Sequence, residues 1–187
     1  MAESRPDFPI GLASLLKDSA QARDLPPVER WHPAHCGDID IRIARDGTWF
    51  HNGTPFARHA LVRLFSTILR KDPDGFHLVT PAEKLRIKVE DAPFLAVLLR
   101  SEGTGPTQRL IFTTNVGDEV EVDPEHAIRV DVDPVTQEPS PYVHVRRGLE
   151  ARLSRSVFYQ LVDLAQSDRH GVLGVYSNGH RFLLGQG

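Results

Sequence analysis

Apolar and polar residues alternate over several short stretches of the chain, and this pattern predicts β-strands with one buried face. Around Asp40 and Arg42, three isoleucines alternate with polar residues, which is the period of a half-buried strand. Asp46-Gly47 favours a type I′ turn, in which both central residues take a positive φ, and residues 49–51 then predict the return strand. Asn52-Gly53 predicts a second turn of the same kind.

Elsewhere the alternation gives way to a helical period of 3.6 residues. A first helix is predicted over residues 10–22 and ends at Leu25-Pro26-Pro27, because a residue before proline avoids the α region. We interpret it as a short amphipathic arm that needs a partner surface, and the sequence leaves open whether its own domain or a second subunit provides it. A second helix is predicted over residues 57–71, with strong turn chemistry at 72–75.

The second half of the chain is rich in predicted strands. Glycine, asparagine and proline mark the breaks between them, and the strands are expected at residues 94–100, 108–114, 119–122, 126–132 and 142–146. Two hairpins are also predicted, one from 76–80 and 84–90 around Pro81 and one over 171–184 around Asn178-Gly179. Ser154 is the expected N-cap of a third helix over 155–166.

The second and third helices are related by a shift of 97 residues (158 − 61). This shift aligns Leu61 with Phe158, Leu64 with Leu161, Phe65 with Val162 and Ile68 with Ala165. Both halves then follow the order strand pair, helix, hairpin, which predicts a duplicated α+β unit rather than a solenoid. We predict a helical arm and linker at 1–30, an N-terminal α+β domain at 31–90 and a C-terminal α+β domain at 91–187. A ligand is expected between the halves, since binding sites favour domain interfaces.

Composition and charge narrow the class of protein. The apolar fraction of 40% and the charged fraction of 25% are those of an ordinary globular protein. The formal net charge of −3 excludes a uniformly basic surface, and the single cysteine excludes an intramolecular disulfide and fits a reducing compartment. The longest apolar run, 94–99, is too short for a membrane span. The N-terminus is acidic and lacks a signal-peptide core, so we predict a cytoplasmic protein.

Three runs of the sequence resemble a family of uncharacterised bacterial proteins that is described only as a domain of unknown function. The runs are CGDIDIRIARDGTWFHNGTPFARHALVRLF, LVTPAEKLRIKVEDAPF and PSPYVHVRRGLEARLSRSVFYQLV. The resemblance covers the chain from Trp31 onward and implies two halves built on a repeated motif. The C-terminal half is then superficially like a pleckstrin-homology fold, a curved antiparallel sheet or partial barrel with one helix. The resemblance also implies a site between the halves for a small molecule or nucleic acid, and a link to signal transduction, but no catalytic residues.

The segment His32-Pro33-Ala34-His35-Cys36, followed by Asp38, carries residue types that bind metals. No second Cys/His cluster completes a known spacing, so a packing or capping role is favoured and we assign no metal ligand and no cofactor. The sequence has no Walker loop, no GxGxxG, no HExxH and no nucleophile elbow. We therefore assign no catalytic residue, and the role of Cys36 stays open.

Polar residues of the first predicted hairpin form one candidate binding surface. Asp38, Asp40 and Arg42 share the strand face opposite the isoleucines, and His51 lies on the return strand. The alternative is a solvated face with weak ion pairs. Trp49 is expected in the core, although a tryptophan beside a cleft can also stack on a planar ligand.

A second candidate surface follows Tyr142, His144 and Arg146, which share one face if the intervening valines point into the core. Arginine offers a planar fork to phosphate or carboxylate, and tyrosine and histidine add donors. The alternative is an ordinary exposed strand face. Arg58, near a predicted helix start, is expected to add to the positive potential there.

We therefore expect a non-enzymatic α+β protein that binds a small anionic ligand or a protein partner between its two halves, in a regulatory or signalling role. One alternative is a metal-dependent hydrolase that uses the segment 32–38. The other is nucleic-acid binding through Arg58, Arg63, Arg146, Arg147 and Arg152. The sequence leaves the oligomeric state open, a homodimer included.

Overall fold

The computed structural model describes residues 8–18 and 25–186. These residues form two compact units. We refer to the unit that contains the chain up to Arg42 and Trp49–Lys88 as unit 1. The predicted domain boundaries stay predictions, because a compact unit need not fold on its own.

Unit 2 contains Ile43–Thr48 and the chain from Val89 onward. The tip of the first hairpin therefore belongs to unit 2, although most of the two strands that it joins belong to unit 1.

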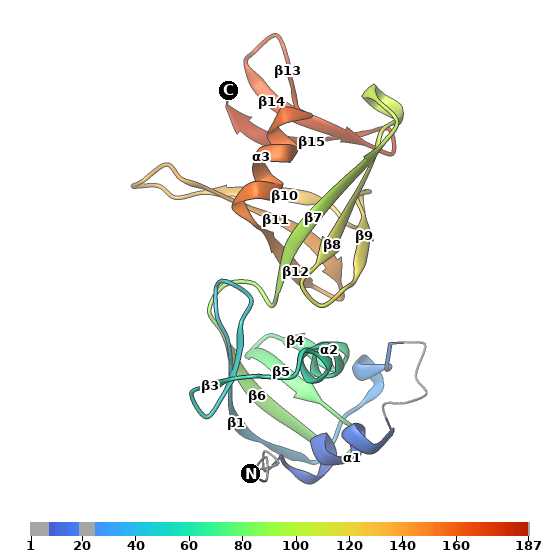
Figure 1. The fold of residues 1–187 in the computed structure, drawn as a ribbon, viewed down its shortest axis with the longest axis vertical. Coiled ribbons are helices and arrows are strands. Elements are labelled where there is room, and N and C mark those ends of the chain that lie inside the picture. The colour runs from blue at the N-terminus through green and yellow to red at the C-terminus, as the bar shows by residue number, and fades with distance from the viewer. Residues whose placement is uncertain (1–7, 19–24, 187) are drawn as a thin grey trace. The chain divides into compact units, whose positions relative to one another are not determined.

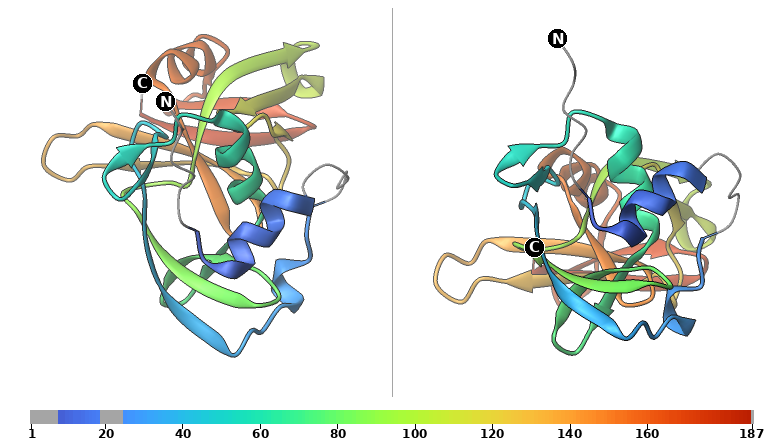
Figure 2. Two further views of the ribbon diagram at one scale, coloured as in Figure 1. Left: turned by 60° about the horizontal axis from the view of Figure 1, so that its bottom comes forward. Right: turned by 90° about the horizontal axis from the view of Figure 1, so that it is seen from below.

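Unit 1 is built on a six-stranded sheet with the strand order β3-β2-β1-β6-β5-β4 (Figure 1). The strands are β1 (His35–Ile43), β2 (Trp49–His51), β3 (Thr54–Pro55), β4 (Leu69–Asp72), β5 (Gly75–Val79) and β6 (Glu83–Val89). The helices are α1 (Ile10–Asp18), α2 (His59–Thr67) and the short 3₁₀-helix η1 (Val28–Arg30). Helices α1 and α2 lie next to one another in both views of Figure 2.

The core of unit 1 lies under these helices, and its residues confirm the predicted alternation in β1. Ile41 is buried, and so are Trp49 on β2 and Phe65 on α2. Helix α1 is anchored to the same unit, because Leu12 is buried and its backbone N–H donates to Glu83 Oε1 at 3.0 Å. The arm therefore packs on its own unit, and its predicted continuation to residue 22 lies outside the described residues.

The helix predicted over 57–71 is confirmed over His59–Thr67, but its predicted continuation to residue 71 is wrong. Helix α2 ends at Thr67, and β4 begins at Leu69 and pairs with β5, placing Leu69 opposite Leu78. The apolar pair at 68 and 69 continues the helical period, but Ile68 is the C-cap of α2 and Leu69 begins β4, and both are buried there. The predicted hairpin of β5 and β6 is confirmed.

The two turns of the first hairpin region differ from each other. Asn52 and Gly53 both have positive φ, 48° and 76°, which confirms the second predicted type I′ turn. At the first turn only Gly47 has a positive φ, 84°, while Asp46 does not, so the type I′ prediction is wrong there. Ala44 instead accepts the N–H of Gly47 and donates to Thr48, both at 2.9 Å, as in a tight turn closed by a glycine bulge.

Unit 2 contains a second six-stranded sheet, with the order β10-β11-β12-β7-β8-β9, that curls into a half-barrel (Figure 1). Its strands are β7 (Phe94–Glu102), β8 (Arg109–Thr114), β9 (Glu119–Glu121), β10 (Ile128–Val132), β11 (Pro139–Arg146) and β12 (Leu149–Leu153). The remaining elements are η2 (Gly105–Thr107), α3 (Arg155–Asp163) and a three-stranded sheet of β13 (Gln166–Ser167), β14 (Val172–Ser177) and β15 (His180–Gln186). The pairs of the half-barrel are antiparallel except for β12 and β7, which run parallel.

Helix α3 confirms the predicted N-cap and corrects the predicted spacing between the second and third helices. Ser154 is its N-cap and accepts the N–H of Val157, as predicted. Its buried residues are Val157 and Leu161, whereas Phe158, which the shift of 97 residues aligns with Leu61, is half-buried. Helices α2 and α3 start 96 residues apart (155 − 59), not 97. Aligned this way, buried Phe65 matches buried Leu161.

The α+β prediction is confirmed: the chain is mostly β, with three α-helices among the described residues and two similar halves, each with a six-stranded sheet. In the described ranges, no helix is both long and apolar enough to cross a membrane. Strand β12, at the centre of the half-barrel, was not predicted.

Candidate functional site

Asp91 of unit 2 accepts two hydrogen bonds and lies within ion-pair distance of a third side chain, and the three partners are far apart in the sequence. Its Oδ1 accepts the Tyr142 hydroxyl at 2.7 Å, and its Oδ2 accepts Arg152 Nη1. Arg45 Nε lies 3.9 Å from the same Oδ2. Burial, the hydrogen bond to Asp91 and the charge of that carboxylate raise the pKa of Tyr142 above its ordinary value, so its hydroxyl stays a donor.

The sheet register explains why these groups meet. Tyr142 on β11 lies between Arg129 on β10 and Arg152 on β12, so all three side chains share one face of the half-barrel. The Arg129 guanidinium lies 4.2 Å from the Tyr142 ring centroid and is held by Glu150 Oε1 at 2.6 Å and Oε2 at 2.8 Å. A contact with Asp131 completes its pairing. Arg129 thus has its charge compensated on two sides, while Arg152 engages Asp91 through a single nitrogen of its fork.

His144 and Arg146, which were predicted to share a surface with Tyr142, have different partners. His144 Nδ1 lies 2.7 Å from the Glu125 carbonyl, and His144 Nε2 accepts the Gly148 N–H at 3.0 Å. Arg146 pairs with Asp118, and its guanidinium lies 4.9 Å from the Phe94 ring centroid. A bulge between His144 and Arg146 interrupts the alternation that the prediction assumed.

The predicted site residues of unit 1 divide between surface and core. Asp38, Asp40 and Arg58 are exposed, whereas Arg42 is half-buried and its guanidinium lies over the Phe50 ring at 4.1 Å. Trp49 is buried at 2% exposure.

His51 belongs to an aromatic cluster rather than to the exposed surface. Its ring stacks on Phe8 with centroids 4.9 Å apart and on Phe56 at 6.2 Å. Six of the predicted site residues lie in unit 1, namely Asp38, Asp40, Arg42, Trp49, His51 and Arg58, and the three on β11 lie in unit 2. A ligand site between the halves stays a prediction.

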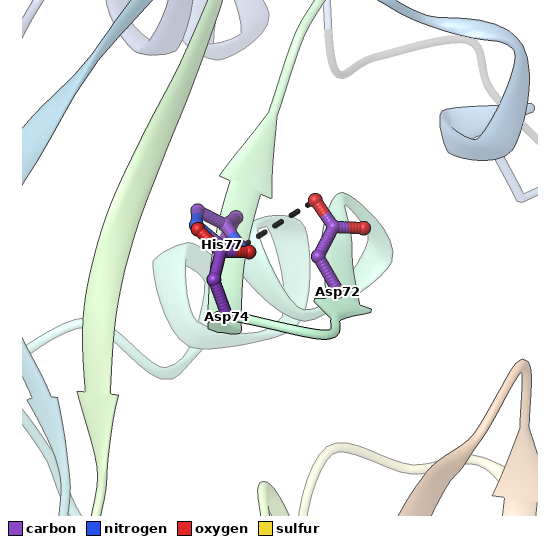
Figure 3. Close-up of side chains that lie close together, drawn as sticks. All are labelled: Asp72, Asp74 and His77. Atoms are coloured by element: carbon purple, nitrogen blue, oxygen red, sulfur yellow. Dashed lines mark ion pairs between the residues drawn. The ribbon is translucent and has the colours of Figure 1, made fainter.

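A second polar cluster surrounds the β4–β5 turn of unit 1 and was not predicted (Figure 3). His77 is only 2% exposed, and its Nδ1 lies 3.7 Å from Asp72 Oδ2 while its Nε2 lies 3.5 Å from Asp74 Oδ2. Arg70 holds both oxygens of Asp72, at 2.8 and 2.9 Å, and Lys84 Nζ lies 3.0 Å from Asp72 Oδ2.

The electrostatics of this cluster follow from burial and from its cations. Burial alone would raise the pKa of Asp72, but hydrogen bonds from Arg70 and Lys84 outweigh it and lower the pKa. A hydrogen bond from Arg86 Nη2, at 2.7 Å, lowers the pKa of Asp74. Burial, reinforced by the charge of Lys84, lowers the pKa of His77 against the opposite influence of the two carboxylates. The imidazole is therefore neutral at physiological pH.

Comparison with known proteins matches both halves of the chain to one family. Residues 26–92 match the N-terminal domain, and residues 93–184 the C-terminal domain, of a protein of unknown function, DUF1285. The chain belongs to this family. The family match confirms the resemblance seen in the sequence, and no curated protein matches this DUF1285 chain.

Two solved structures of the DUF1285 family are similar to the chain. One, from Silicibacter pomeroyi DSS-3, is 50% identical, with a TM-score of 0.84 over 92% of this chain and 94% of that chain. The other, from Shewanella baltica OS155, is 31% identical, with a TM-score of 0.53 over 67% of this chain and 91% of that chain. Both are described only as DUF1285 family proteins, so they support the fold and the family rather than a function.

The segment 32–38 does not form the metal cluster that the hydrolase alternative requires. Within the described ranges, the group of His, Cys, Asp and Glu side chains close enough to hold an ion is Asp72, Asp74 and His77. Cys36 is exposed. The sequence does contain a signal for this cluster, because His77 lies two residues after the Asp-Pro-Asp-Gly turn. Turn formation alone accounts for both aspartates, so nothing in the sequence pattern groups them with the histidine.

The lowered pKa of His77 predicts a loss of stability of unit 1 at mildly acidic pH. An unfolded histidine takes up a proton as the pH falls through its ordinary value of 6.5, whereas the folded one resists protonation. The contribution is therefore complete above 6.5 and declines as the pH drops from there toward the lower folded pKa. Denaturant unfolding at pH values on both sides of 6.5 measures this decline.

His77→Gln is expected to remove the decline just below pH 6.5, whatever its effect on stability at neutral pH. His35→Gln, a change at an exposed histidine, is expected to keep it. The lowered pKa values of Asp72 and Asp74 act below 3.8, outside this window. An unchanged decline in His77→Gln contradicts the assignment.

Proposed function

We propose that the protein is a non-enzymatic binding protein that holds a small anionic molecule through Arg45 and Arg152. The observation that supports this proposal is the convergence of both guanidinium groups on one carboxylate, Asp91. Asp91 orients the Arg152 fork without using all of its donors, because the hydrogen bond that Arg152 donates to it, within the described residues, comes from Nη1 alone. Arg45 Nε lies within ion-pair distance of the same carboxylate, at 3.9 Å. A planar fork with unused N–H groups binds carboxylate or phosphate in a bidentate way.

The surroundings of this pair suit a small ligand rather than a polyanion. Arg45 is 70% exposed and Arg152 is 24% exposed, so an anion can reach both. The Glu90 carboxylate accepts the backbone N–H of Arg45 at 3.1 Å, so the local charge is nearly balanced. Recognition then depends on the geometry of the forks and not on a strong positive potential.

Nucleic-acid binding has less support, because a phosphate backbone needs many uncompensated cations at once. Arg146 is already paired with Asp118 and Arg152 with Asp91. Two of the three other candidates of this alternative, Arg58 and Arg147, also have interaction partners, and the third, Arg63, is exposed. A protein partner, a cytoplasmic location and a role in signal transduction stay with the proposal as expectations from the sequence and its family resemblance.

A thermal-shift and calorimetric screen tests the proposal with inorganic phosphate, a nucleoside monophosphate, dicarboxylates and a short single-stranded DNA. Ligand at about 100 times its Kd is expected to stabilise the folded protein by about 2.7 kcal/mol. Phosphates and dicarboxylates form separate arms, so the screen also tells which anionic group is preferred. Arg152→Gln is expected to abolish the shift.

Arg109→Gln is the matched control, because Arg109 is an exposed arginine paired with Glu102 and Glu121 in the same unit. It is expected to keep the full shift. Equal shifts in Arg152→Gln and in the wild type, or no shift with any small anion, would overturn the proposal. A response to the DNA alone that weakens steeply with salt would favour the nucleic-acid alternative instead.

A further inference from the structure

His77 carries a polar atom that the protein itself does not satisfy. Its Nδ1 is buried and has no hydrogen-bond partner within the described part of the chain. A buried nitrogen without a partner costs free energy, and an ion bound at the site would remove that cost. The ring is flanked by two carboxylates, with Asp72 on the side of Nδ1 and Asp74 on the side of Nε2 (Figure 3).

We propose that Asp72, Asp74 and His77 bind a divalent transition-metal ion of the zinc type. The three residues each offer one ligand atom, and these atoms lie within 4.8 Å of one another, close enough for a shared ion after small side-chain rotations. One imidazole nitrogen with two carboxylates suits Zn²⁺ and its neighbours, whereas Mg²⁺ and Ca²⁺ prefer oxygen ligands alone. Water completes the coordination of a site with three protein ligands.

The cations that surround the carboxylates differ in how easily they can leave. Arg70 is 13% exposed and also donates to the carbonyl oxygens of Val28 and Trp31, at 2.8 and 2.9 Å. It is therefore held in place and orients Asp72, as outer-sphere partners of metal ligands do.

Lys84 and Arg86 are the mobile competitors for the metal. The Arg86–Asp74 pair is about half exposed on both sides, so water replaces it at little cost. Lys84 is 22% exposed and its flexible stem lets the ammonium turn outward. A metal ion then takes over the charge compensation that these two side chains provide in its absence.

His77 is surrounded by charged side chains from two parts of unit 1. The groups that face the ring are Asp72 and Asp74 from the turn side and Lys84 and Arg86 from β6. When an ion enters, Lys84 and Arg86 give up their carboxylate partners, whereas Asp72 keeps Arg70.

Calorimetric titration of the metal-free full chain with Zn²⁺ tests the proposal, with Mg²⁺ as the comparison ion. The wild type is expected to bind one Zn²⁺ at this site and to prefer it clearly over Mg²⁺. Asp74→Asn removes a half-exposed ligand charge without touching the core and is expected to weaken Zn²⁺ binding by more than about tenfold. Co²⁺, followed by its visible absorption, reports the loss of the imidazole ligand in His77→Gln independently.

A variant of the competing cation Arg86 is expected to strengthen Zn²⁺ binding, whereas the ligand variants weaken it. Arg86→Gln removes the side chain that neutralises Asp74 and is expected to tighten Zn²⁺ binding by about 2–5-fold, the size of an exposed ion pair. If the cluster only stabilises the fold, Arg86→Gln is expected to cause no gain in Zn²⁺ affinity. Circular dichroism of each variant establishes that the fold is retained.

Two controls separate this site from other ligands in the chain. Glu102→Gln changes an exposed carboxylate of unit 2 that is also paired with an arginine, and is expected to bind Zn²⁺ like the wild type. His35→Ala tests the segment 32–38, which is a source of background binding among nine histidines, and is expected to keep the site. Undiminished Zn²⁺ binding in both Asp74→Asn and His77→Gln, or its loss in His35→Ala, overturns the proposal.

Discussion

Replacing Phe65 with alanine is expected to lower the free energy of unfolding of unit 1 by about 3–5 kcal/mol. Phe65 is fully buried, and its ring meets those of Phe8 and Phe56 edge-on, with centroids 5.2 and 5.9 Å apart. Truncation therefore loses the transfer free energy of the ring and two aromatic contacts, and leaves a cavity between α2 and the N-terminal segment.

Tryptophan fluorescence during denaturant unfolding reports this loss selectively, because both tryptophans of the chain, Trp31 and Trp49, belong to unit 1. Arg63→Ala on the same helix is the matched control. Arg63 is exposed, and its replacement is expected to change stability by no more than about 0.5 kcal/mol. A loss below about 1 kcal/mol for Phe65→Ala would show that the site collapses without cost, contrary to the packing described above.

Two of the predicted site residues belong to the same aromatic cluster. Trp49 lies in the core with its ring edge-on to Phe56, and the His51 ring stacks on both Phe8 and Phe56. A pattern of alternating residues places both side chains on a strand but cannot say what covers them. Phe8, which covers His51, lies 43 residues away in the sequence (51 − 8).

Local signals predicted most of the elements of the fold. The isoleucine alternation of β1, the Asn178-Gly179 turn of the last hairpin and the Ser154 cap each depend on residues within a few positions of one another. Such features are readable because turn geometry and capping act over one to four residues. The same holds for the strand-rich second half.

Elements that depend on partners far away were misjudged. The predicted helix over 57–71 runs through Leu69, since nothing nearby shows that β5 pairs with residues 69–72. Strand β12 was missed even though Leu149, Ala151 and Leu153 alternate with polar residues. Its place at the centre of the half-barrel depends on a parallel pairing with β7, more than 50 residues earlier (151 − 94 = 57).

The candidate sites show the same limit more strongly. Arg45 and Asp91 were each readable as turn or surface residues, and only the fold brings them together with Arg152. The predicted stripe of Tyr142, His144 and Arg146 assumed a regular alternation along β11. A bulge between His144 and Arg146 interrupts that alternation, and such a bulge has no simple sequence signal. The sequence thus points to arginines as candidate anion ligands but does not show which of them the fold brings together.

Replacing Gly47 with alanine is expected to lower the free energy of unfolding of unit 2 by about 2–4 kcal/mol. Gly47 has a φ of 84°, which costs an L-residue about 1–2 kcal/mol. An added Cβ would also lie 2.7 Å from Asn115 Nδ2 and 3.3 Å from Leu95 Cβ. Asn115 cannot yield freely, because its Oδ1 accepts the Leu95 N–H at 3.0 Å and its Nδ2 donates to the Gly47 carbonyl at 3.3 Å.

Gly148→Ala separates the two causes of this loss. Gly148 belongs to the same unit and has a similar φ of 72°, but an added Cβ would meet nothing within 4 Å. It is therefore expected to lose only the backbone part, about 1–2 kcal/mol. Equal losses at the two glycines, measured by calorimetry of the full chain, would mean that contact with Asn115 costs nothing.

Asn115→Ala provides the decisive comparison. If the contact with Asn115 causes the extra loss at Gly47, then Gly47→Ala is expected to cost no more than Gly148→Ala once the Asn115 side chain is absent. Because Arg45 lies two residues before Gly47 on the same hairpin tip, a displaced tip also moves one of the two proposed anion ligands. Gly47→Ala is accordingly expected to weaken the anion-induced thermal shift, and Gly148→Ala to leave it unchanged.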